Sequence, residues 1–151
     1  MSYTAADARR QLLDELAAGA DDLGAALAAV GEAYERVDEQ TADELEARLF
    51  RPLQAAYGRA KRTHAEFAGR HGISPHVFAP APVHAPAEPR DEIGRAVDAV
   101  HRADETLATL QDSLLPVEVG DPELRAGISD VRALIAPLPT QARGLLRTLG
   151  R

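Results

Sequence analysis

Residues 13–37 read LDELAAGADDLGAALAAVGEAYERV, and apolar side chains recur in this stretch at alternating steps of three and four residues. Such spacing keeps one apolar stripe along one side of a helix, as in coiled coils and helical bundles. Thr4 and Asp7 form a capping pair ahead of the stripe, so we expect a helix over residues 4–38. The stripe consists of Leu13, Leu16, Ala20, Leu23, Leu27, Val30, Tyr34 and Val37.

Three later stretches carry the same pattern. The second helix is expected over residues 41–71, because Thr41 and Glu44 form a capping box at its start and Gly72 suits the left-handed residue that ends a helix. The third is expected over residues 89–115 and the fourth over residues 121–149, each opened by a proline beside acidic residues. Their stripes are, in order, Ala42, Leu45 (or Glu46), Leu49, Leu53, Ala56, Ala60, Thr63 and Phe67; Ile93, Ala96, Val100, Ala103, Leu107, Leu110 and Leu114; and Leu124, Ile128, Val131, Ile135, Leu138, Ala142, Leu145 and Leu149.

Prolines inside the second and fourth helices predict that these long helices are kinked. Pro52 has no amide hydrogen and clashes with the carbonyl group of Arg48, yet the apolar stripe continues in phase on both sides of it. We therefore expect a kink at Pro52, and a sharp bend at Pro137 and Pro139. The third helix should stop at Pro116.

Four amphipathic helices predict an all-α fold, with residues 1–151 forming one four-helix-bundle domain. A proline-rich loop, residues 72–88, joins the second helix to the third. The expected topology is an antiparallel up-down-up-down bundle; the alternative is a ferritin-like bundle, in which the loop crosses the length of a helix. Residues 1–50 carry 12 acids and four bases, and residues 72–123 carry ten acids and three bases. The crossover would place these two acidic helices side by side, so charge favours the first topology, although exposed pairs contribute only ~0–1 kcal/mol.

Composition excludes several classes of function. The chain has no cysteine, hence no disulfide, thiol nucleophile or iron–sulfur cluster. A net charge of −7 argues against nucleic-acid binding. No apolar run approaches the ~20 residues of a membrane span, and the first residues lack the basic start of a signal peptide. We therefore expect a cytoplasmic protein that binds neither nucleic acid nor membrane. One lysine against 16 arginines fits a GC-rich bacterial genome.

No motif in the sequence predicts catalysis. A dimetal bundle needs inward Glu-x-x-His pairs, and none occurs. His101 and Glu105 share a helix face but follow the core position Val100, so we expect them at the surface, and every histidine is expected outside the core stripe. Neither a Gly-x-Ser-x-Gly elbow nor a nucleotide-binding glycine pattern is present. We expect no enzyme activity, no metal site and no cofactor.

Two functional hypotheses follow from these observations. The first is a non-enzymatic bundle that acts through protein contacts or self-association, with the apolar loop residues Val77, Phe78 and Val83 contacting the partner. The alternative is a bundle that binds or senses a small molecule in a cavity opened by the kinks at Pro52 and Pro137/Pro139. That cavity is expected to be lined by Tyr34, Tyr57 and Phe67.

Overall fold

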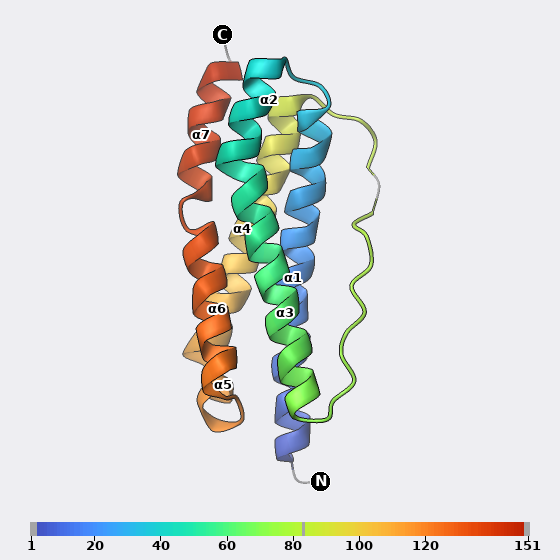
Figure 1. The fold of residues 1–151 in the computed structure, drawn as a ribbon, viewed down its shortest axis with the longest axis vertical. Helices are drawn as coiled ribbons and strands as arrows, with labels where there is room; N and C mark the ends of the chain where they lie inside the picture. Colours follow the sequence, from blue (N-terminus) through green and yellow to red (C-terminus); the bar gives the residue numbers. More distant parts are fainter. Residues whose placement is uncertain (1–2, 83, 150–151) are drawn as a thin grey trace.

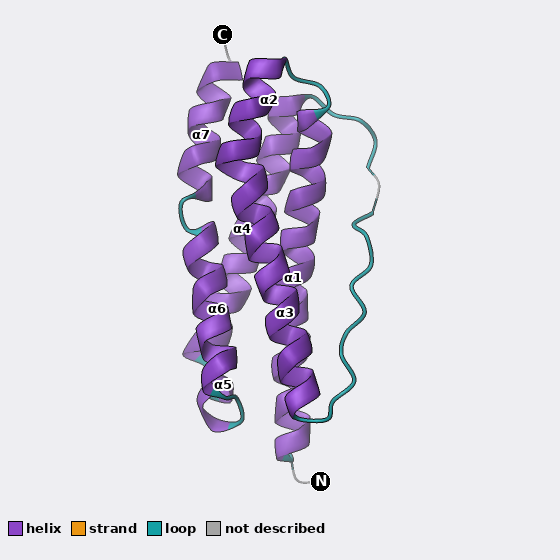
Figure 2. Ribbon diagram, in the orientation of Figure 1, coloured by secondary structure: helices purple, strands orange, loops and turns teal. Residues whose placement is uncertain are grey.

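The computed structural model describes residues 3–82 and 84–149, and these residues form helices that run side by side, with no strand among them (Figures 1 and 2). The chain has one long N-terminal helix, a second long helix with a π-helical turn, a third helix, and a fourth that is interrupted. The elements are α1 (Ala5–Tyr34), α2 (Glu39–Leu45), η1 (Glu46–Phe50), α3 (Arg51–Arg70), α4 (Pro89–Asp112), α5 (Leu115–Glu118), α6 (Pro122–Ile135) and α7 (Leu138–Leu149).

The caps agree in part with the expected ones. Thr4 and Asp7 cap α1 reciprocally, as predicted. The second helix starts earlier than expected, because the side chain of Asp38 accepts a hydrogen bond from the Thr41 amide at 2.7 Å and serves as N-cap in place of Thr41. Gly72 has a φ of +64°, the left-handed conformation expected after the helix end.

The predicted interruptions take two different forms. At Pro52 the helix continues, and a π-helical turn at η1 lies directly before the proline, where the Arg51 amide bonds the Glu46 carbonyl group. Such a wider turn accommodates a local break in the usual hydrogen-bond pattern. At Pro137 the helix breaks: α6 ends at Ile135 and α7 begins at Leu138. The break arises because proline has no amide hydrogen and its ring clashes with the preceding turn.

Two expectations about the third helix are wrong. Helix α4 ends at Asp112, and Pro116 lies in the first turn of the short helix α5 instead of stopping α4. A proline is tolerated there because the first turn has no intrahelical partner for its amide. Leu114, expected in the core, is therefore in the connection and 67% exposed.

The expected up-down-up-down order is also wrong. Helix α1 packs against α4 and α3, and α6 packs against α3 and α4. The segment of residues 73–88, called the strap below, runs outside the helices from the end of α3 to the opposite end of the molecule, where α4 begins (Figure 1). Helices α3 and α4 therefore run in the same direction, joined by the crossover connection that the alternative topology requires.

Close packing explains why charge did not decide the order. Helices α1 and α4 meet through buried alanines and glycine, and a Cβ atom on Gly19 would lie 3.1 Å from Leu107. Acidic side chains of these helices are paired with arginines: Asp22 of α1 is 3.4 Å from Arg102 of α4, and the buried Glu92 of α4 is 3.1 Å from Arg95. Burial of apolar surface outweighs exposed, screened charges. The shared core contains most of the predicted stripes, but Tyr34 is exposed and Leu27, Val37 and Leu149 are half-buried.

Candidate functional site

Two arginines, one in α1 and one just after it, hold the strap near its two ends. Arg10, in the second turn of α1, donates a hydrogen bond to the Ser74 carbonyl group at 2.9 Å, and Arg36, just after α1, donates to that of Ala87 at 2.6 Å. These arginines are roughly 40 Å apart along the helix. Between the two attachments the described residues of the strap have no regular secondary structure. No backbone–backbone hydrogen bond is formed by the described residues between these two attachments.

A fully buried histidine lies beneath the strap. His64 of α3 is fully buried, and neither Nδ1 nor Nε2 has a hydrogen-bond partner among the described residues. Buried polar groups are nearly always hydrogen-bonded. The imidazole of His64 is therefore an exception to this rule among the described residues, as is the neighbouring Thr63 hydroxyl group.

Aromatic rings of the strap cover His64. The Phe78 ring lies edge-to-face with the imidazole, with 5.3 Å between ring centroids, and the His76 ring lies 6.3 Å away. His76 and Phe78 also stack edge-to-face at 4.9 Å. Phe78 packs against the main apolar core, so this three-ring cluster connects the strap to the helices.

The charges around His64 come from α1 and from the strap. Burial lowers the pKa of His64, and the nearby His76 and Arg10 lower it further, whereas Asp14 and Asp21 act in the opposite direction. Asp21 also lies 3.5 Å from His76 Nε2. The neutral imidazole is therefore the form that this environment favours.

A second polar cluster joins the end of α3 to the start of α6. Asp121 caps α6 by accepting from the Leu124 amide, and it also accepts two hydrogen bonds from Arg70, at 2.8 and 2.9 Å. His71 lies 3.2 Å from the same carboxylate. Burial opposes ionisation of Asp121, but the hydrogen bonds from Arg70, Leu124 and His71 lower its pKa from 3.8 to about 2. This cluster is a structural clamp between two helices.

The three predicted ligand-binding aromatics lie in different surroundings. Tyr34 lines a surface hollow beside Phe50. Tyr57 lines a different hollow, of about 430 Å³, between α1, α3 and the strap. Phe67 is fully buried in the core and contacts the ring of His71. The structure does not bring the three together.

The kinks leave little space between them. The void bordered by Leu49 and Leu53 on one helix and by Leu138 and Pro139 on another measures about 10 Å³. A cavity of that size holds at most one water molecule. Side chains are therefore closely packed between the two interruptions at this level of the core.

The predicted partner-binding residues differ in exposure. Val77 is 84% exposed, whereas Phe78 is half-buried against the core. Val83 lies outside the described residues. The Val77 side chain is therefore open to solvent, whereas that of Phe78 is held against the core.

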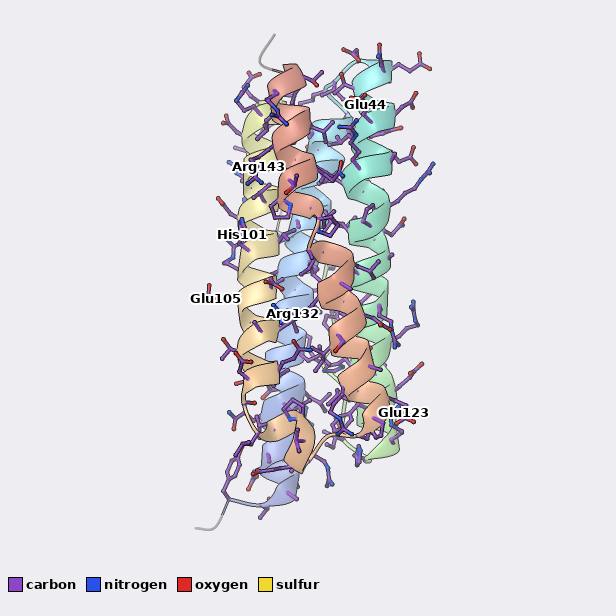
Figure 3. The ribbon with its side chains drawn as sticks, turned by 90° about the vertical axis from the view of Figure 1, so that its left-hand side faces the viewer. Glu44, His101, Glu105, Glu123, Arg132 and Arg143 are labelled. Atoms are coloured by element: carbon purple, nitrogen blue, oxygen red, sulfur yellow. The ribbon has the colours of Figure 1, made fainter. Side chains whose placement is uncertain are left out.

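His101 and Glu105 project outward from α4, and Arg132 of α6 donates a hydrogen bond to Asp104 on a neighbouring face of the same helix (Figure 3).

Among the described residues, no three or more His, Asp or Glu side chains are arranged to hold a metal ion. No helix in the described part of the chain has the length and apolar character needed to cross a bilayer.

Sequence reasoning missed His64, which was expected outside the core. The stripe followed only alternating three- and four-residue steps, which pass through Ala60, Thr63 and Phe67. His64 is four residues after Ala60 and three before Phe67, so it flanks the stripe on the same side of the helix. A wider stripe would have included His64 and the equally buried Ala68.

Comparison with protein-family models, with characterised proteins and with solved structures finds no match for this chain.

Proposed function

We propose that this protein is a four-helix bundle with a crossover connection that acts by binding another protein, without catalysing a reaction. The strap supplies the recognised surface. The observation that carries this proposal is an extended, proline-rich segment that is attached at Ser74 and Ala87 and has Val77 exposed between these points.

Extended proline-rich segments suit recognition for an entropic reason. A partner with an aromatic-lined groove can bind a polyproline II segment that already has the bound shape, so little conformational entropy is lost. Attachment of the strap by Arg10 and Arg36 restricts it further. The expected partner is a protein that reads Val77 and the neighbouring Pro75, Pro80 and Pro82.

The test compares two single substitutions at exposed apolar residues. Wild-type protein, Val77→Asp and Leu114→Asp are immobilised and exposed to an extract of the native host, and retained proteins are quantified by mass spectrometry. Leu114 is 67% exposed but lies far from the strap in sequence, in the connection after α4, which makes it the matched control. We expect one near-stoichiometric protein to be retained by the wild type and by Leu114→Asp, and lost with Val77→Asp.

Two results would contradict this function. Equal retention of the same proteins by all three baits would mean that the strap is not the recognised surface. The absence of any stoichiometric protein on the wild-type bait would remove the proposal altogether. Retention of the chain itself would identify self-association as the protein contact.

A second candidate function, binding of a small molecule, is favoured by the hollow beneath the strap. Tyr57, Asp21 and His76 contribute an aromatic ring, a carboxylate and an imidazole to its lining. Burial and the charge of Asp21 raise the pKa of Tyr57, so its hydroxyl group stays a hydrogen-bond donor at neutral pH. A compound bound there should raise the melting temperature of the wild type most, that of Tyr57→Phe less because the hydroxyl group is lost, and that of Tyr57→Ala not at all.

A further inference from the structure

His64 is enclosed on one side by helices and on the other by the strap. The helical side is continuous with the apolar core, in which α1 and α3 pack against each other. The strap side consists of the rings of His76 and Phe78, in a segment without regular secondary structure. These two sides differ in how much structure must be lost to bring water to the imidazole.

We propose that protonation of His64 releases the strap from its docked position over α1 and α3. An imidazolium ion buried without an acceptor is unfavourable, because transfer of a charge out of water must be compensated by a partner. Neither ring nitrogen of His64 has one among the described residues. Removal of Phe78 and His76 from above the ring gives the ion access to water and leaves the helices in place.

The charges near His64 have mixed signs, so they disfavour the imidazolium ion only in combination with the burial of the ring. Arg10 and Asp14 reach it from α1 with opposite signs, and Asp21 acts from the same helix near His76. Neither aspartate is hydrogen-bonded to the ring, so their negative charges offset the desolvation of the imidazolium only in part. The pKa of His64 is consequently below its ordinary value of 6.5.

Protonation of His76 acts in the opposite sense on the strap and is weaker. His76 and Asp21 are 41% and 49% exposed and lie 3.5 Å apart, so a charged His76 gains an ion pair that holds the strap to α1. Exposed pairs of this kind contribute little because water and salt screen them. The same charge also adds to the repulsion felt by a charged His64. The buried group therefore decides the outcome.

The sign of the pH dependence follows from the lowered pKa of His64. With the strap docked, the imidazole stays neutral; with the strap released, water contact restores its ordinary affinity for a proton. The released form binds more protons, so acidification through and below about pH 6.5 favours release. At higher pH both forms are neutral and the docked strap is retained. This device does not depend on a partner and goes beyond the proposed function.

Pulsed electron spin resonance can measure the release directly. The chain has no cysteine, so spin labels can be attached to a Val77→Cys, Glu105→Cys double variant, with both sites exposed. The expected result is a narrow distance distribution near pH 8 and loss of that narrow component near pH 5. Far-UV circular dichroism should show unchanged helix content over the same range.

Two substitutions and a titration control this experiment. His64→Leu and His64→Phe, each in the doubly labelled chain, place an apolar side chain of similar size under the strap. Neither side chain can take up a proton, so the narrow distance distribution should persist near pH 5. His76→Gln should keep the wild-type transition. The His64 ring resonances, followed by NMR, should titrate with the same midpoint as the distance change.

Three results would overturn the proposal. One is a narrow distribution in the wild type at both pH values. Another is loss of the narrow component near pH 5 in both His64 variants. The third is a His64 titration midpoint that differs from that of the distance change, which would separate the two events even if both variants fail to hold the strap near pH 8.

Discussion

Thr63 and His64 are consecutive residues of α3, both are buried, and their side chains have no hydrogen-bond partner among the described residues. Different segments of the chain cover the two side chains. Thr63 faces α6, where a Cβ atom on Gly127 would overlap its Oγ1 and lie 2.6 Å from its Cγ2. His64 faces the strap and contacts the ring of Phe78.

The difference shows that two equally buried side chains can require different free energies to become exposed to water. On the α6 side, contacts such as Thr63 with Gly127, and hydrogen bonds such as Arg70 with Asp121, join two regular helices. To expose Thr63, these helices must separate, which breaks the core. On the strap side, the covering residues can leave with few backbone hydrogen bonds lost. Local opening should therefore occur first at His64.

Replacement of phenylalanine by alanine should have the largest effect in the core, at Phe67, and a much smaller effect in the strap, at Phe78. Phe67→Ala should lower the free energy of unfolding by about 3–5 kcal/mol, because Phe67 is fully buried among helices. Phe78→Ala, which removes a half-buried ring from the strap, should lower it by about 1 kcal/mol. Urea unfolding measures both values, and equal losses would contradict the distinction between the two covers.

Gly127→Ala tests the closeness of α3 and α6. The added methyl group overlaps Thr63, so we expect a loss of about 1–3 kcal/mol, part of which Thr63→Ala in the same chain should restore. Gly94→Ala in α4 is the matched control, since nothing lies within 4 Å of its added Cβ atom. That control should raise stability by roughly 0.5–1 kcal/mol. A neutral Gly127→Ala would show that the two helices are less closely packed.

Asp121→Asn tests the clamp between α3 and α6 through pH. The hydrogen bonds from Arg70 and Leu124 outweigh burial and lower the pKa of Asp121 to about 2, a shift that corresponds to about 2 kcal/mol of stability. Because the pKa is lowered, this stability is present above about pH 4 and disappears as the pH falls through 2. The variant should therefore be less stable than the wild type near pH 6, and the difference should shrink towards pH 2 in thermal unfolding.

The smallest effect is expected at the ion pair of Arg59 with Asp130, which also joins α3 to α6. The two groups lie 3.1 Å apart, but the carboxylate is largely exposed. Asp130→Ala should change the free energy of unfolding by less than about 1 kcal/mol, and salt should reduce the change further. A larger loss would mean that exposed charges, and not close packing, hold α6 to α3.

Sequence periodicity predicted the helices well because each one carries its own signals. The stripes around Leu16 and Leu107 and the capping pair at Thr4 depend on neighbours within a few turns. Boundaries moved where two local signals competed, as at Asp38 and Thr41, either of which can cap a helix. Pro116 was misread because a proline ends one helix and begins another with the same fixed φ.

Less of the candidate site could be predicted. Val77 and Phe78 were named from their apolar character in a polar, proline-rich loop, but the exposure of one and the packing of the other depend on which helices the loop crosses. Tyr34, Tyr57 and Phe67 were grouped as one lining, although the helices place them at different levels and on different sides. Sequence spacing reports the face of one helix, not its distance from another.

The sequence alone predicted long amphipathic helices, the prolines that interrupt two of them, and a non-helical loop over residues 72–88. These properties follow from side-chain periodicity and from proline, which act over a few residues. Only in the tertiary structure is it evident that α1 lies beside α4, that the strap runs along α1 from Arg10 to Arg36, and that His64 is buried beneath the strap. Those outcomes depend on how closely surfaces far apart in sequence fit together, and close fit outweighs the small, screened energies of surface charge.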